Sequence, residues 1–214
     1  MSKKRLFSFL LLPLLLLTAC GITEELEQAK NNVADLKSAL TEQSDNYQQL
    51  SAYIEEIPEA FQLDREEDPD MGLFADETGE VFDNLQVRQE LHSTMINTQK
   101  KIKNIKKELD RIVKKNGADV NNSQLTIISR SLEIVTSNFD SLSVYVETSV
   151  SQEQQFYDDL PMKEENMDDE LSIIQRTYGA MDIVSEEAQA NIDYTLSLIK
   201  TFEKDAAQSK ERGK

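Results

Sequence analysis

Cys20 is the only cysteine in this chain of 214 residues, and it directly follows an apolar run. A single cysteine cannot form an internal disulfide, and it cannot complete a Cys-x-x-Cys redox motif or a metal-binding pair. Cys20 is therefore either a stray buried thiol or a residue kept for a reaction that is carried out on its sulfur.

The residues before Cys20 are typical of an export signal. A basic cluster at 3–5 precedes twelve residues, 6–17, that are apolar except for Ser8 and Pro13. A helix needs about 20 apolar residues to cross a bilayer, so this run is too short to serve as a membrane span. A basic start, a short apolar stretch and small residues at its end indicate a secretory signal peptide.

The sequence Leu17-Thr18-Ala19-Cys20 resembles the lipobox of bacterial lipoproteins. This resemblance implies that the sulfur of Cys20 receives a diacylglyceryl group and that the chain is cut just before it. Two acyl chains make a stable membrane anchor. We therefore predict a lipoprotein signal peptide over 1–19 and a lipid-anchored domain over 20–214 on the extracytoplasmic face of the cell membrane. The alternative is an ordinary signal peptide, in which Cys20 has no role.

Composition favours an acidic, helical protein. The formal net charge is −17, and it becomes −20 once residues 1–19 are removed, because they hold three basic and no acidic residues. Such a charge argues against nucleic acid as a partner, since nucleic-acid binding requires a basic surface. Six glycines, four prolines and no tryptophan suit long helices better than sheets with many turns.

Apolar residues recur in paired rows seven residues apart, which is typical of coiled-coil packing. Four such seams run through 26–57, 81–112, 125–160 and 171–202. The second seam is weaker at its start, where it includes Arg88, and the third seam includes Glu153. They predict an all-α fold, an elongated up-and-down four-helix bundle with coiled-coil-like heptad seams and a length of about 50 Å. Because the four stripes can bury one another, we expect a monomer. The alternative is an open coiled coil that needs a partner chain.

Several residues predict where the helices begin and end. Thr23 is a plausible start for the first helix, and Pro58 should end it. Residues 58–79 lose the heptad period, which predicts a long acidic connection with room for one short helix. Asn116-Gly117 should end the second helix, and Ser123 should cap the third.

The sequence contains no motif that points to catalysis. It has no glycine-rich phosphate loop, no Gly-x-Ser-x-Gly and no His-Glu-x-x-His. We expect its single histidine, His92, to be solvated or half-packed. The acidic run Asp64 to Gly72 lacks the spacing of a calcium-binding EF-hand loop, although weak binding of divalent cations stays open. We therefore expect a non-enzymatic protein without a cofactor or a dedicated metal site.

The segment EQQFYDDL, Glu153 to Leu160, completes a wider resemblance. Together with the lipobox cysteine and the acidic helical body, it resembles the YkyA-type cell-wall-binding lipoproteins of Gram-positive bacteria over most of 20–214. The resemblance implies a helical bundle on the outer face of the membrane that binds cell-wall material, and it carries no catalytic residue. The alternative is an adaptor or accessory subunit that docks onto a membrane protein complex.

Charge is distributed unevenly along the predicted bundle. Residues 55–80 hold eleven acidic residues and one arginine, and residues 158–170 hold seven acidic residues and one lysine. An up-and-down topology places both segments at the end far from Cys20, where they should favour a cationic partner or divalent ions. The near end should carry a basic patch facing anionic lipid: Lys106, Lys107, Lys114 and Lys115. The alternative is that these lysines balance acids on neighbouring helices.

Overall fold

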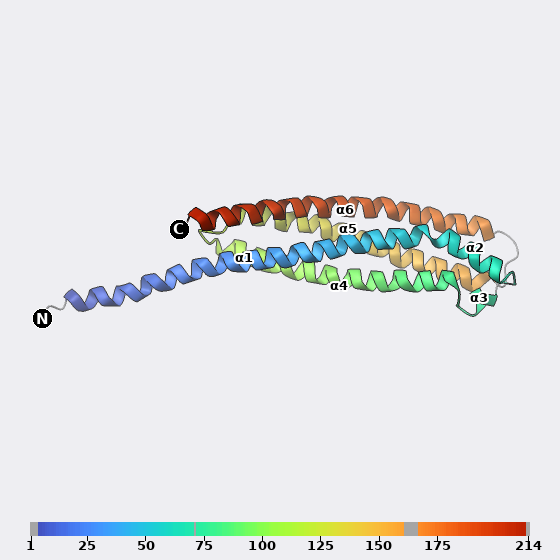
Figure 1. Cartoon of the computed structure of the whole chain (residues 1–214), viewed down its shortest axis with the longest axis horizontal. Coiled ribbons are helices and arrows are strands. Elements are labelled where there is room, and N and C mark those ends of the chain that lie inside the picture. Colours follow the sequence, from blue (N-terminus) through green and yellow to red (C-terminus); the bar gives the residue numbers. More distant parts are fainter. Residues whose placement is uncertain (1–3, 71, 161–166, 213–214) are drawn as a thin grey trace.

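A computed structural model describes residues 4–70, 72–160 and 167–212, with side chains from residue 24 onward except at 168 and 209–212. The described residues form helices and no strands (Figure 1). The helices are α1 (Lys4–Glu55), α2 (Ile57–Glu67), α3 (Gly72–Ala75), α4 (Glu80–Lys115), α5 (Asn122–Asp159) and α6 (Met167–Arg212). The all-α prediction is confirmed.

The long helices α1, α4, α5 and α6 form an elongated up-and-down bundle. Each packs against two others, in the cyclic order α1, α4, α5, α6. The short helices α2 and α3 lie at one end, which we call the distal end (Figure 1). The chain ends and the α4–α5 turn lie toward the other, the proximal end, and α1 extends past the other helices there.

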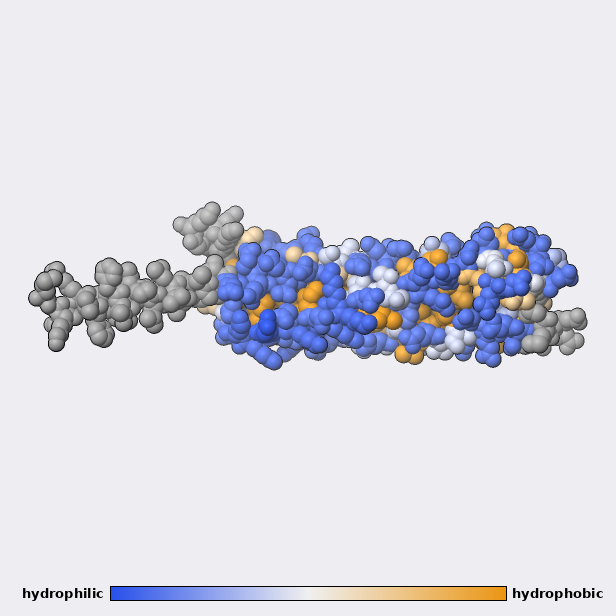
Figure 2. All heavy atoms as spheres, turned by 90° about the horizontal axis from the view of Figure 1, so that it is seen from below, coloured by the Kyte–Doolittle hydropathy of each residue, from blue (hydrophilic) through white to orange (hydrophobic). Residues whose placement is uncertain are grey.

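The heptad seams make the core. Leu40, Met95, Leu132 and Ile192 represent the four long helices, and each is 0% exposed. The α5 seam is buried from Leu125 to Leu160 as predicted. On the face seen in Figure 2, hydrophilic residues dominate and hydrophobic ones surface in small separate patches. The bundle therefore hides its apolar stripes within one chain.

Two expected helix starts differ from the structure. α1 begins at Lys4 instead of Thr23, because the leucine-rich segment continues into the bundle helix without a strong breaker at their junction. α5 is capped by Asn121 instead of Ser123, since Asn121 Oδ1 accepts a hydrogen bond from the Gln124 backbone N–H at 3.2 Å. Ser123 already lies within the first turn. Asn116 ends α4 in the left-handed conformation, as predicted.

The acidic connection is more ordered than the sequence predicted. α1 ends at Glu55 as expected, but α2 starts two residues later with Pro58 in its first turn. Proline is tolerated there because the first N–H groups of a helix have no intrahelical acceptor. Ala60, Phe61 and Asp64 point inward from α2 and are buried. The segment therefore folds onto the bundle as two short helices instead of forming one long loop.

The packed part of α1 begins near Glu25. Its carboxylate lies 3.7 Å from the ammonium of Lys115 in the last turn of α4. The first buried residue among the described side chains is Ala29, so the chain from residue 21 onward keeps the whole described core. Among the described residues, no helix is both long and apolar enough to span a membrane.

Replacing Phe139 by alanine tests the phase of the third seam. Phe139 is 4% exposed at the centre of α5, so Phe139→Ala should lower the free energy of unfolding by about 3–5 kcal/mol. Ile134 is 51% exposed on the same helix, and Ile134→Ala should change it by less than about 0.5 kcal/mol. Urea unfolding followed by circular dichroism measures both. Equal losses in the two variants would contradict this assignment of faces.

Candidate functional site

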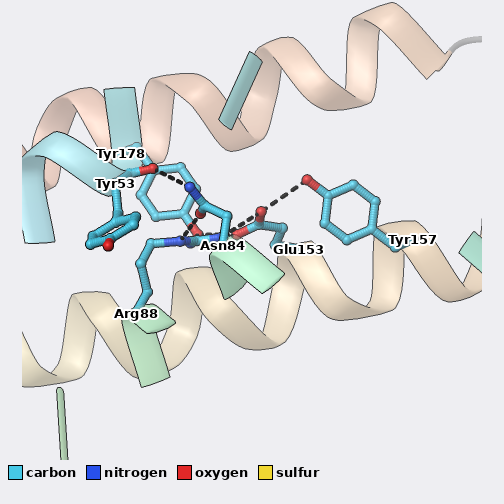
Figure 3. Close-up of polar contacts among 6 residues, drawn as sticks. All are labelled: Tyr53, Asn84, Arg88, Glu153, Tyr157 and Tyr178. Carbon is cyan, nitrogen blue, oxygen red and sulfur yellow. Dashed lines mark hydrogen bonds and ion pairs between the residues drawn. The ribbon is translucent and has the colours of Figure 1, made fainter. Parts of the chain in front are cut away.

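A buried ion pair joins α4 and α5 toward the distal end. Arg88 is 1% exposed and Glu153 is 0% exposed. Arg88 Nη1 lies 2.7 Å from Glu153 Oε2, and Nη2 lies 2.8 Å from Oε1 (Figure 3). This two-pronged geometry is the strongest arrangement of arginine and carboxylate, and it fixes the relative position of the two helices.

Four further groups complete what we call the buried network. Arg88 Nε donates to Asn84 Oδ1 at 2.7 Å, and Asn84 Nδ2 donates to the Tyr53 carbonyl at 2.9 Å. Tyr178 Oη accepts from Arg88 and donates to Glu153, while Tyr157 Oη donates to Glu153 Oε1 at 2.9 Å. The network therefore links α1, α4, α5 and α6 (Figure 3).

The electrostatics of the network favour an ion pair with neutral phenols. Burial alone would lower the pKa of Arg88, but the charge of Glu153 and its hydrogen bonds outweigh this and raise it. Burial and the charge of Glu153 raise the pKa of both Tyr157 and Tyr178. Arg88 Cζ also lies 5.3 Å from the centre of the Tyr178 ring, a cation–π contact. Both carboxylate oxygens of Glu153 thus accept from neutral and charged donors.

An aromatic cluster connects the network to the short helices. The Tyr157 ring centre lies 5.7 Å from Phe74 of α3 and 6.2 Å from Phe61 of α2. It also lies 5.7 Å from Phe82 of α4 and 5.4 Å from its neighbour Phe156. Tyr157 therefore bonds to Glu153 through its hydroxyl and holds α2 and α3 through its ring. Of the buried side chains of EQQFYDDL, Glu153 and Tyr157 belong to the network, Phe156 and Tyr157 belong to the aromatic cluster, and Leu160 lies in the apolar core.

Asp64 and Asp68, two acids of the run considered for calcium, bind backbone instead. Asp64 Oδ1 and Oδ2 accept from the N–H groups of Glu80 at 2.8 Å and Val81 at 2.9 Å, which caps α4. Gly79 has φ +99°, and a Cβ there would lie 2.7 Å from Asp64 Oδ1. Asp68 Oδ2 accepts from the Leu73 N–H at 2.9 Å. Within the described ranges, no cluster of three or more metal-ligating side chains occurs.

A cleft of about 270 Å³ lies between α1–α2 and α4 at the distal end. Its lining combines carboxylates with apolar side chains, and we call it the acidic cleft. It is lined by Tyr53, Glu56, Glu59, Ala60, Leu63, Glu80, Asp83, Asn84 and Val87. Asn84 joins its two walls, because its side chain bonds the α1 carbonyl of Tyr53 while receiving the bond from Arg88. The buried network therefore fixes the shape of the cleft.

A second cleft of about 240 Å³ lies between α5 and α6. Its floor includes Phe156, Ile173 and Ile174, and its acids are Asp159 and Glu170. Both of these acids already take part in other interactions. The acidic cleft has more carboxylates and a direct link to the network, so we take it as the candidate binding site.

Two of the four lysines of the predicted basic patch, Lys106 and Lys115, have acidic partners in the structure. Lys106 lies 3.0 Å from Asp110 and 3.2 Å from Glu133, whereas Lys107 and Lys114 are exposed. Burial alone would lower the pKa of Lys106, but its hydrogen bonds to Asp110 and Glu133 raise it. Together with the Lys115–Glu25 pair, these contacts favour the alternative that the lysines balance neighbouring acids. A membrane role for the patch stays a prediction.

Cys20 and His92 are the remaining residues singled out by the sequence. Cys20 lies in α1, but its side chain is outside the described part, so its lipidation stays a prediction. His92 is packed more fully than expected: it is 9% exposed, and its Nε2 lies 2.8 Å from Ser143 Oγ. Burial lowers the pKa of His92, although the charge of Glu147 partly offsets this. It lies apart from the acidic cleft and does not line it.

Sequence reasoning assigned Arg88 and Glu153 to the core rows but did not pair them. The usable signal was one charged residue on the buried row of each of two predicted neighbouring helices. A lone buried charge is too unfavourable to persist, so each required a partner. The acidic cleft gave no comparable signal, because its walls come from two segments whose relative position the sequence does not state.

No family model, curated protein or solved structure matches this chain. The candidate site is therefore identified from the geometry of this chain alone.

Arg88→Met tests the buried ion pair. It should lower the free energy of unfolding by about 3–5 kcal/mol, because the Glu153 carboxylate stays buried without its cation. Adding Glu153→Gln should restore part of the loss, since an amide is neutral: its oxygen accepts from one tyrosine hydroxyl, and its nitrogen donates to the other hydroxyl oxygen. Urea unfolding of both variants measures the difference. A double variant less stable than Arg88→Met would show that unpaired charge does not cause the loss.

Proposed function

We propose that this chain is a non-enzymatic, lipid-anchored binding protein of the membrane–cell wall boundary, whose rod presents its distal end to a cationic partner. The observation that carries the proposal is that the predicted anchor and the acidic cleft lie at opposite ends of the rod. α1 starts the packed bundle near Glu25, five residues after Cys20, whereas the acidic cleft lies at the distal end. At about 1.5 Å per helical residue, the separation is on the order of 50 Å.

The negative charge of the distal end favours a cationic partner over an anionic one. Residues 55–80 hold eleven acids and one arginine, and the acidic cleft collects Glu56, Glu59, Glu80 and Asp83 on its rim. Anionic lipid and anionic wall polymers would be repelled by this end, while a positively charged segment would be attracted at long range. The charge therefore favours an adaptor-like role toward a cationic protein over binding to anionic wall polymers. The resemblance to YkyA-type lipoproteins agrees with the proposed location.

Cys20→Ala tests the anchor. Without the sulfur that accepts the diacylglyceryl group, the protein should lose fatty-acid labelling and leave the membrane fraction. Metabolic labelling with a radioactive fatty acid, followed by membrane fractionation, measures both. Ser8→Ala, elsewhere in the predicted signal, should keep the label. Label retained on Cys20→Ala, or absent from the parent chain, would exclude the lipid anchor.

Photo-crosslinking in cells tests which end meets the partner. A photoreactive amino acid at Glu59, exposed on the distal α2, should give a discrete protein adduct. The same residue at Lys114, exposed in the last turn of α4, should not give that adduct. Gel electrophoresis before and after cell-wall digestion separates protein adducts from wall adducts. A common adduct at both positions, or adducts at Lys114 alone, would contradict presentation by the distal end.

A further inference from the structure

We infer that the acidic cleft binds a basic amphipathic segment of a partner protein, placing an apolar side chain on the cleft floor and lysine or arginine at its rim. The inference rests on the proposed function and deepens it by naming the site and the chemistry of its occupant. Three properties of the cleft carry it: an apolar floor, an acidic rim and a fixed back wall.

The floor offers apolar surface that the bundle itself does not cover. Leu63 is 48% exposed although it lies on α2, a helix whose opposite face is buried against the core. Ala60, Val87 and Tyr53 complete this surface from α2, α4 and α1. The volume of about 270 Å³ is just below the range of small-molecule pockets, which span about 300–1,000 Å³. It suits one or two inserted side chains better than a cofactor.

The rim carries uncompensated negative charge. Glu56 and Glu59 stand on the α1–α2 side, and Glu80 and Asp83 stand in the first turn of α4. Within the described part of the chain, none of these four carboxylates has a lysine or arginine partner. Their mutual repulsion falls when a cation enters, so charge complementarity selects a basic occupant.

The back wall is held in place before anything binds. Asn84 lines the cleft, donates to the Tyr53 carbonyl and accepts from the buried Arg88. Because these bonds tie α1 to α4, the two walls keep their spacing in the unbound protein. A preorganised site spends less of its binding free energy on ordering its own groups than a site that its ligand must order.

The amphipathic character of the occupant separates this inference from simple charge attraction. An oligolysine satisfies the rim but places no apolar side chain on the floor. A segment with leucine on one face and lysine on the other satisfies both, as in other helix-in-groove complexes. The segment should therefore bind more tightly than an oligolysine of equal charge.

Fluorescence anisotropy of labelled peptides tests the inference on residues 21–214, after circular dichroism confirms helical folding. The probes are a leucine–lysine amphipathic peptide and an oligolysine of equal charge. The parent protein should bind the amphipathic peptide about tenfold more tightly. Leu63→Gln should remove most of that preference. Ile134→Gln, at a similarly exposed site on α5, should keep it.

A matched pair of charge variants locates the binding. Glu59→Gln/Asp83→Asn should weaken binding about tenfold at low salt. Asp76→Asn/Glu77→Gln removes one aspartate and one glutamate from the distal turn after α3, outside the cleft, and should weaken it much less. Equal weakening by both pairs, equal affinity for the two peptides, or an unaffected Leu63→Gln would each overturn the inference. Distal crosslinking in cells would then still support the proposed function, so the two failures are distinguishable.

Discussion

The burial of Arg88 against Glu153 constrains the distal half of the molecule. Removing two charges from water costs several kcal/mol per ion, and the pair persists only if its donors and acceptors are satisfied. Tyr157 and Tyr178 donate further hydrogen bonds to the Glu153 carboxylate, and Asn84 accepts a hydrogen bond from Arg88 Nε. A slip of one helical turn, about 5.4 Å, would separate all of these partners. Seams of leucine and isoleucine tolerate such slips far better, so this network fixes the register of α4 against α5 and α6.

The same network orders a segment whose composition would otherwise favour solvation. Tyr157 reaches from Glu153 into the aromatic cluster that holds Phe61 and Phe74, and Asp64 then caps α4 through two backbone N–H groups. Two short helices are thereby fixed despite eleven acids within residues 55–80. Among these acids, Asp64 and Asp68 bind backbone, whereas Glu56, Glu59 and Glu80 line the cleft together with Asp83 of α4.

Much of this fold can be predicted from spacing alone, and the site cannot. Residues seven apart share a helix face, so the seams and the four-helix topology follow from the sequence. Arg88 and Glu153 lie 65 residues apart in the sequence. Pairing them requires the register of α4 against α5, which no pattern within one helix contains. Pro58 illustrates a second ambiguity. The same residue that ends one helix suits the first turn of another, so the sequence indicated a stop but not the restart as α2.

The acids at the cleft have a structural explanation that accounts for only part of the arrangement. Glu59, Glu80 and Asp83 lie in first turns, where negative charge interacts favourably with the helix dipole. The dipole effect depends on the distance of each acid from the start of its own helix. It does not depend on which side chains lie between the two helices. It does not explain why Leu63 stays half exposed between the acidic starts of α2 and α4. A polar residue there would stabilise α2 equally well and leave less apolar surface in water. The coincidence of uncovered apolar surface with unpaired carboxylates is therefore the observation that supports a binding site here, because acidic first turns alone do not account for it.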